Sequence, residues 1–173
     1  MKLTIIINGM GGVGKDTLCR IAAKTYRVEN ISAIDPIKEI AAMCGWQGEK
    51  TDRARKFLSD LKQLTVLYND FPTVWLTERY RRFLESDDEI LFVHIREPQE
   101  IAKFVRVTEG KAKTLLIRGG KRMMKKAGHY GNASDDEVEN YAYNYIYEND
   151  TPLDEAEPSF LATLRKIIAD AEA

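Results

Sequence analysis

The feature that most constrains the fold is a glycine-rich loop close to the amino terminus. A short apolar run from Leu3 to Ile7 leads into this loop, and a helix-like pattern begins at Lys15. Glycines let successive backbone N–H groups turn toward an anion, and the helix that follows directs the positive end of its dipole at the same point. A lysine at the end of such a loop supplies a movable cation for the outer phosphates of a nucleotide. The segment therefore predicts a site for an ATP-type triphosphate, formed by Gly9, Gly11, Gly12, Val13, Gly14, Lys15, Asp16 and Thr17.

The residue after the lysine departs from the usual GxxxxGK[ST] pattern. Asp16 stands where a Ser or Thr would normally help to bind Mg²⁺, and Thr17 follows one position later. We predict that Asp16 and Thr17 manage the metal ion, with Asp16 acting through water or orienting the acceptor. The alternative is that Asp16 only complements the helix dipole in the first turn.

The rest of the chain alternates between strand-like and helix-like patterns, which is typical of an α/β fold with a parallel sheet. Apolar, β-rich runs predict strands at Leu3–Ile7, Val28–Ile34, Ile90–Ile95, Thr114–Ile117 and Tyr143–Tyr147. Helices are predicted at Lys15–Tyr26, Pro36–Cys44, Asp52–Tyr68, Pro72–Glu85, Pro98–Val107 and Leu153–Ala171.

Two segments interrupt this alternation within what we expect to be a single domain of residues 1–173. Consecutive helices at 45–88 predict a helical, acceptor-binding insert at the carboxyl edge of the sheet. The segment 118–136 is rich in glycine and basic residues, and it predicts a short lid-like loop.

Candidate acceptor-binding residues follow the second predicted strand and continue into the insert. Asp35 and Lys38 lie at the carboxyl edge, where open α/β folds bind their ligands. Arg55 is suited to a bidentate grip on phosphate, and Trp75 to stacking on a base. The alternatives are that Asp35 is an N-cap with Lys38 solvated, that Arg55 belongs to a solvated charged face, and that Trp75 packs in the core.

Cations for the transfer point are expected near the third strand and in the lid. Arg96 lies at the mouth of the third strand, where it would grip phosphate, and Arg118 and Arg122 would neutralise charge on the transferring group. His94 takes the strand-end place where enzymes with this loop usually carry an acid for the water shell of Mg²⁺. A neutral His accepts a hydrogen bond from such water but adds no negative charge.

Composition excludes several other classes of protein. The net charge of −1 gives no broad nucleic-acid footprint, and the first apolar run is too short for a membrane span. Cys19 and Cys44 lack CxxC spacing, which argues against zinc or a disulfide framework and favours a reducing cytoplasm. We expect small-molecule nucleotide substrates as partners, no nucleic acid and no membrane, and either a monomer or a homodimer.

A set of short segments, in their shared order along the chain, resembles one known family. The segments are Gly14-Lys15-Asp16-Thr17, Asp35-Pro36-Ile37-Lys38-Glu39, Gly45-Trp46 with Arg55 and Leu58, Arg96-Glu97-Pro98 with Glu100, Ser134 to Glu137, and Tyr145-Ile146-Tyr147-Glu148-Asn149. Together they resemble the deoxynucleoside monophosphate kinases of bacteriophages, a branch of the P-loop nucleoside monophosphate kinase group that includes adenylate kinase. The resemblance implies a P-loop NTPase fold of three α/β/α layers with a five-stranded parallel sheet, Mg-ATP as donor, and phosphate-binding roles for Lys15, Arg96 and a lid arginine. His94 departs from that family, which tends to have Asp there.

The expected activity is therefore ATP-dependent phosphoryl transfer to a nucleoside or deoxynucleoside 5′-monophosphate, giving the diphosphate. Two alternatives stay open: a kinase for a non-nucleotide phosphorylated metabolite, and a nucleotide-binding protein without turnover. The preferred base and sugar cannot be read from these residues.

Overall fold

The structure, a computed structural model, describes residues 1–120 and 137–173, and it is built on one five-stranded sheet. The strands are β1 (Leu3–Asn8), β2 (Val28–Ser32), β3 (Ile90–His94), β4 (Lys113–Gly119) and β5 (Tyr145–Asn149). Their order across the sheet is β2-β3-β1-β4-β5, and every neighbouring pair is parallel. The predicted α/β fold with a five-stranded parallel sheet is confirmed.

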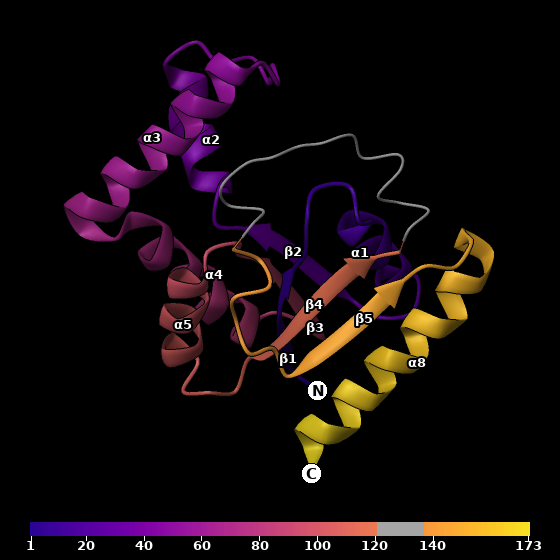
Figure 1. Ribbon diagram of the computed structural model, residues 1–173. Coiled ribbons are helices and arrows are strands. Elements are labelled where there is room, and N and C mark those ends of the chain that lie inside the picture. The colour runs from indigo at the N-terminus through magenta and orange to yellow at the C-terminus, as the bar shows by residue number, and fades with distance from the viewer. Residues whose placement is uncertain (121–136) are drawn as a thin grey trace.

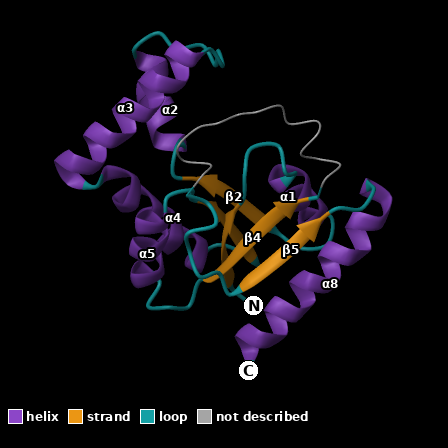
Figure 2. Cartoon of the chain, in the orientation of Figure 1, coloured by secondary structure: helices purple, strands orange, loops and turns teal. Residues whose placement is uncertain are grey.

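Helices follow the strands on both sides of the sheet, as Figures 1 and 2 show. They are α1 (Lys15–Ala23), α2 (Asp35–Met43), α3 (Asp52–Asn69), α4 (Phe71–Glu85), α5 (Pro98–Val107) and α8 (Leu153–Glu172). Each lies close to its predicted range. Among the described residues, none of the helices has the length and apolar character that a membrane crossing requires.

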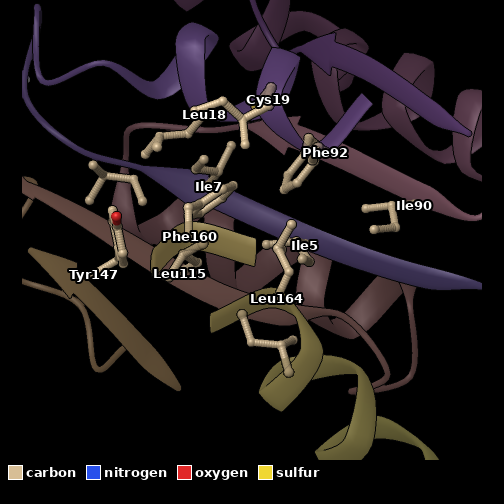
Figure 3. Close-up of a cluster of buried hydrophobic side chains, with 14 of the residues drawn as sticks. Ile5, Ile7, Leu18, Cys19, Ile90, Phe92, Leu115, Tyr147, Phe160 and Leu164 are labelled. Carbon is tan, nitrogen blue, oxygen red and sulfur yellow. The ribbon is translucent and has the colours of Figure 1, made fainter. Parts of the chain in front are cut away.

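Alternating residues of the central strand define the layers. Ile5 and Ile7 of β1 face a cluster that contains Leu18 of α1 and Phe160 of α8 (Figure 3). Ile6, between them, faces the opposite cluster, whose helical members include Leu76 and Phe83 of α4 and Ile101 and Phe104 of α5. A parallel strand that is buried on both faces reads as a continuous apolar run, which is why β1 was visible in the sequence.

Two strand boundaries differ from the predicted ones for identifiable reasons. β2 ends at Ser32 instead of Ile34, because the Asp35 carboxylate accepts a hydrogen bond from the Ser32 N–H at 2.7 Å and the chain turns into α2. β5 begins two residues late, at Tyr145. Before it, the Asn144 side chain accepts a hydrogen bond from the Thr114 N–H at 2.9 Å, so a side chain occupies the place of a ladder bond.

The helical insert divides into one helix that stands clear of the sheet and one that joins the core. α3 buries only Ala54, whereas α4 buries Leu76 and Phe83 against the sheet. Figure 1 shows α3 extending past the carboxyl edge of the strands. It is therefore α3, rather than α3 and α4 together, that forms a separate wall above this edge.

An ion pair ties α3 to the loop between β3 and α5. The Lys62 ammonium group donates to both carboxylate oxygens of Glu97, at 2.8 and 2.7 Å, and the two side chains are only 14% and 33% exposed. Burial alone would raise the pKa of Glu97, but the Lys62 charge and its hydrogen bonds outweigh burial and hold the pKa below its usual value of 4.5. Together with the packing of α3 on α2 and α4, this pair joins α3 to the rest of the domain.

The glycine loop rests on the neighbouring strand with no room for a side chain at its first residue. A Cβ on Gly9 would lie 2.5 Å from the carbonyl oxygen of Ile117 in β4, and Gly9 has a φ of +151°. Gly11, in the same loop, would meet nothing within 4 Å and has no positive φ. Gly9 therefore sets how closely the loop approaches the sheet.

Gly9→Ala should lower the free energy of unfolding by about 2 kcal/mol, because the added Cβ meets a backbone oxygen at a strained φ. This loss corresponds to a fall in Tm of about 4–8 °C in thermal unfolding followed by circular dichroism. The matched control Gly11→Ala should change the free energy of unfolding by less than about 0.5 kcal/mol. Equal losses for the two variants would contradict the close approach at Gly9.

Lys62→Met should destabilise the protein by about 2 kcal/mol at pH 7, because it leaves the Glu97 carboxylate half-buried without its cation. Since folding lowers the pKa of Glu97, the pair stabilises the fold above pH 4.5, and this contribution is lost as the pH falls through the folded-state value. The difference between variant and wild type in urea unfolding should therefore shrink at acidic pH.

Lys56→Met is the control on the same helix. Lys56 pairs with Asp60 in an exposed contact, with side chains 75% and 58% accessible, so its loss should cost less than about 0.5 kcal/mol at any pH. A pH-independent cost for Lys62→Met would show that packing, not charge, joins α3 to the core.

Candidate functional site

A cleft of about 1400 Å³ lies at the carboxyl edge of the sheet, between the glycine loop and α3. Its walls come from the β1–α1 loop, the β2–α2 loop, α3 and the β3–α5 loop. The carboxyl edge is where open α/β sheets bind ligands, because the strand ends and the helix amino termini meet there. Most of the predicted site residues are brought together in this cleft.

The predicted phosphate loop has the backbone shape that its glycines allow. Gly12 and Gly14 adopt φ values of +79° and +93°, which non-glycine residues rarely adopt. The Lys15 ammonium group folds back over the loop and donates to the carbonyl oxygens of Gly9 and Met10, the second at 2.9 Å. The lysine thus lies over the loop mouth, where it can exchange these carbonyls for phosphate oxygens.

Two buried asparagines that the sequence analysis did not single out hold the loop at its two ends. Asn8, 1% exposed, accepts from the Gly9 N–H at 2.8 Å and donates to the Arg96 carbonyl oxygen at 3.0 Å. Asn149 at the end of β5, 4% exposed, donates to the Val13 carbonyl oxygen at 2.9 Å. A polar residue directly after the run of isoleucines in β1 was the available signal for Asn8. Nothing local marks Asn149, because its partner is distant in sequence.

Asp16 and Thr17 lie in the cleft at the start of α1. The Thr17 hydroxyl oxygen accepts a hydrogen bond from Arg20 at 3.2 Å. Among residues 1–120 and 137–173 there is no group of three His, Cys, Asp or Glu side chains that could hold a metal ion alone. Mg²⁺ usually keeps several waters and takes phosphate oxygens with only one or two protein ligands, so a carboxylate and a hydroxyl beside the phosphate loop fit it. Their role as its ligands stays a prediction.

His94 lies at the end of β3, in the wall of the same cleft. Its Nε2 is 2.8 Å from Oδ1 of Asn30 on β2 and 3.8 Å from Sγ of Cys19 on α1. Burial lowers the pKa of His94 to about 4, with Asp16 and Asp35 partly offsetting that effect and Lys15 and Arg96 adding to it. The imidazole is therefore neutral at physiological pH. Burial, followed by the Asp16 charge, raises the pKa of Cys19 to about 12, so its thiol stays protonated.

The predicted acceptor residues Asp35, Lys38, Arg55 and Arg96 all line the cleft. The alternative that Asp35 is the N-cap of α2 is wrong, because Ile34 holds that position and no side chain caps the helix. The Asp35 carboxylate instead accepts a hydrogen bond from the N–H of Ser32 at the end of β2. The same wall carries further cations that the sequence analysis passed over, namely Lys50, Lys56 and Lys62. Arg55 lies 3.9 Å from the fully exposed carboxylate of Asp52, in a loose ion pair. The insert side of the cleft also carries Asp52 and Asp60, so its cations outnumber its acids by four to two.

Four of the predicted residues that the structure describes lie outside the cleft lining, namely Gly9 and Val13 of the loop, Trp75 and Arg118. Trp75 packs against the second core cluster, with the Arg79 guanidinium 5.5 Å from its ring centroid, which is the core-packing alternative. This burial gives no support to a base-stacking role for Trp75.

Arg118 near the end of β4 pairs with Glu139 at 2.8 Å and with Glu148 at 3.4 Å, and these carboxylates raise its pKa. To act on a transferring phosphate, Arg118 must leave both of them. Arg122 and most of the predicted lid lie outside the described residues.

Comparison with protein-family models finds no match, and comparison with the sequences of curated proteins finds none either. Solved structures do resemble this chain. A tunicamycin resistance protein from Deinococcus radiodurans has a TM-score of 0.59 at 10% identity, covering 95% of this chain and 96% of its own. Thymidylate kinase from Candida albicans has a TM-score of 0.56 at 12% identity, covering 95% and 92%. A gluconokinase from Sinorhizobium meliloti has a TM-score of 0.53 at 19% identity, covering 97% and 94%. At such identities the likeness concerns the fold: the chain has the fold of the P-loop kinases over nearly its whole length.

Proposed function

We propose that this chain transfers the γ-phosphoryl group of ATP to a nucleoside or deoxynucleoside 5′-monophosphate and releases the two diphosphates. The observation that carries the proposal is that a phosphate loop with its lysine and a basic helix, α3, line the same cleft. A cleft with two separate anion-binding walls suits two phosphorylated substrates whose phosphates must meet.

The donor side is formed by the loop. The backbone N–H groups of the Gly11–Gly14 turn and the amino terminus of α1 would hold the β- and γ-phosphates, and Lys15 would move from its two carbonyl partners onto them. Because Asn8 and Asn149 already hold the loop, binding needs little ordering of its backbone. When bound, Mg²⁺ would supply neutralising charge between the phosphates, and Asp16 and Thr17 are the residues that would hold it.

The acceptor side is formed by Lys38, Arg55 and Arg96. Arg55 would reach across from α3, while Arg96 extends from the end of β3 near the glycine loop. Arginine matches phosphate geometry with two parallel hydrogen bonds, which orients the acceptor oxygen toward the donor. Catalysis then rests on positioning and on charge stabilisation, and it requires no strong general base.

One observation favours a second candidate, a kinase for a non-nucleotide phosphorylated metabolite. In the part of the chain that the structure describes, the cleft lining contains aliphatic side chains such as Ile31, Ile34 and Leu58 but no Phe, Tyr or Trp side chain. Stacking on a base is therefore not provided by those residues. The basic wall would suit any phosphorylated acceptor, so acceptor trials must include both classes.

The chain should release ADP from Mg-ATP when one of the common ribo- or deoxyribonucleoside monophosphates is present. Lys15→Ala should reduce this release about a hundredfold to a thousandfold, because removing one preorganised donor at the reacting group commonly costs this much. A coupled assay of ADP release measures both. Turnover only with phosphorylated sugars or other metabolites would select the second candidate, and ATP binding without any turnover would select a nucleotide-binding protein.

Arg55→Ala should raise the KM for the acceptor roughly tenfold to a hundredfold and leave the KM for ATP unchanged, since it removes a charged hydrogen bond on the acceptor side only. Arg53→Ala is the matched control: Arg53 lies two residues earlier on α3, is exposed and does not line the cleft. Initial rates at varied acceptor concentration compare the two. Equal effects would remove Arg55 from the acceptor site.

A further inference from the structure

His94, in the wall of the cleft, contacts the side chain of Asn30 on the neighbouring strand β2. β2 and β3 are in parallel register with Asn30 opposite Phe92 and Ser32 opposite His94. Asn30 and His94 therefore project from the same face of the sheet, one diagonal step apart. Phe92 and Cys19 belong to the core cluster on that face, the face covered by α1 (Figure 3). The 2.8 Å contact between the Asn30 amide oxygen and Nε2 of His94 spans this diagonal.

With the Asn30 amide oxygen toward the ring, the contact assigns the proton of the neutral imidazole to Nε2. A neutral imidazole has one N–H group and one lone pair, and the Asn30 amide oxygen can only accept. A proton on Nε2 gives a normal hydrogen bond at 2.8 Å, whereas a lone pair there would set two acceptors against each other. The Cys19 sulfur, 3.8 Å from the same nitrogen, is compatible with an N–H group as well. Nδ1 is then the nitrogen that keeps the lone pair.

This assignment matters because of what surrounds the ring. His94 lines the cleft together with Asp16 and Thr17, the two residues that would hold Mg²⁺. Mg²⁺ bound to a nucleotide usually keeps several of its waters, and these waters are hydrogen-bond donors. A ring nitrogen with a lone pair can accept a hydrogen bond from such a water, whereas a ring nitrogen that carries a proton repels the hydrogen atoms of the water. The tautomer of His94 thus decides whether it can replace a strand-end carboxylate.

We propose that Asn30 is a positioning residue that fixes His94 as the Nε2–H tautomer, so that Nδ1 accepts a hydrogen bond from the water shell of the donor-bound metal ion. The proposal rests on the proposed function, since it gives His94 a task only at a metal–nucleotide site. Asn30 touches neither substrate nor metal in this scheme. It acts through the ring, as partners of functional histidines commonly do.

The first test reads the tautomer directly. Long-range ¹H–¹⁵N spectra of the ligand-free protein at pH 8.5 should show His94 protonated at Nε2, with His94→Gln used to assign its signals. Asn30→Leu, which keeps the size of the side chain but removes the acceptor, should move the proton partly or wholly to Nδ1. Asn30→Asp keeps an acceptor oxygen and should preserve the Nε2–H form. A wild-type ring protonated at Nδ1 would overturn the proposal.

The second test reads the consequence for metal binding. The affinity for ADP is measured by calorimetry with Mg²⁺ and with a chelator, and the ratio of the two gives the contribution of the metal. Asn30→Leu should reduce this ratio on the order of tenfold and leave the metal-free affinity unchanged, while Asn30→Asp should retain it. An unchanged ratio in Asn30→Leu would refute the role of Asn30. Failure of the wild type to bind ADP under either condition would instead refute the proposed function, and the ring spectra would still report the tautomer.

Discussion

The arrangement of the site depends on the close approach of the Gly9 backbone to the carbonyl oxygen of Ile117. β1 and β4 are neighbours in the sheet, so the loop that leaves β1 must pass over the end of β4. Only a residue without a Cβ passes at this distance. Asn8 and Asn149 then hold the loop from β1 and from the edge strand β5. The phosphate loop is therefore a product of the sheet order, not only of its own glycines.

The second half of the cleft depends on charge instead of close packing. α3 buries little apolar surface, so its position above the sheet relies on directed contacts such as the one between Lys62 and Glu97. A charged hydrogen bond stabilises one geometry yet can break and re-form more readily than an interdigitated core. The glycine loop is thus held by buried hydrogen bonds, whereas α3 is held by its packing on α2 and α4 and by the Lys62–Glu97 pair. This division suits a site that must receive a second substrate and close around it.

The sequence patterns predicted features that consecutive residues form. They missed contacts between residues that are distant in the sequence. The central strands were readable because burial on both faces makes them continuous apolar runs, and the phosphate loop because all its parts are consecutive. β5 was displaced by two residues because Asn144 replaces a ladder bond with its side chain and the strand ends in the polar pair Glu148 and Asn149. Asn149 and Lys62 act on partners far along the chain, and no spacing reveals such a pair. Trp75 was a candidate by residue type alone, and its side chain packs in the core.

His94 stands at the strand end where the resemblance led us to expect a carboxylate. With a neutral ring there, the acids that act on it are Asp16 and Asp35, and the cations are Lys15 and Arg96. A more positive site attracts the phosphates of a nucleotide more strongly and a metal ion less strongly. In the proposed scheme, a lone pair directed by Asn30 would orient the metal's water without adding negative charge. The metal would then be held chiefly through the nucleotide, so donor and metal would arrive and leave together.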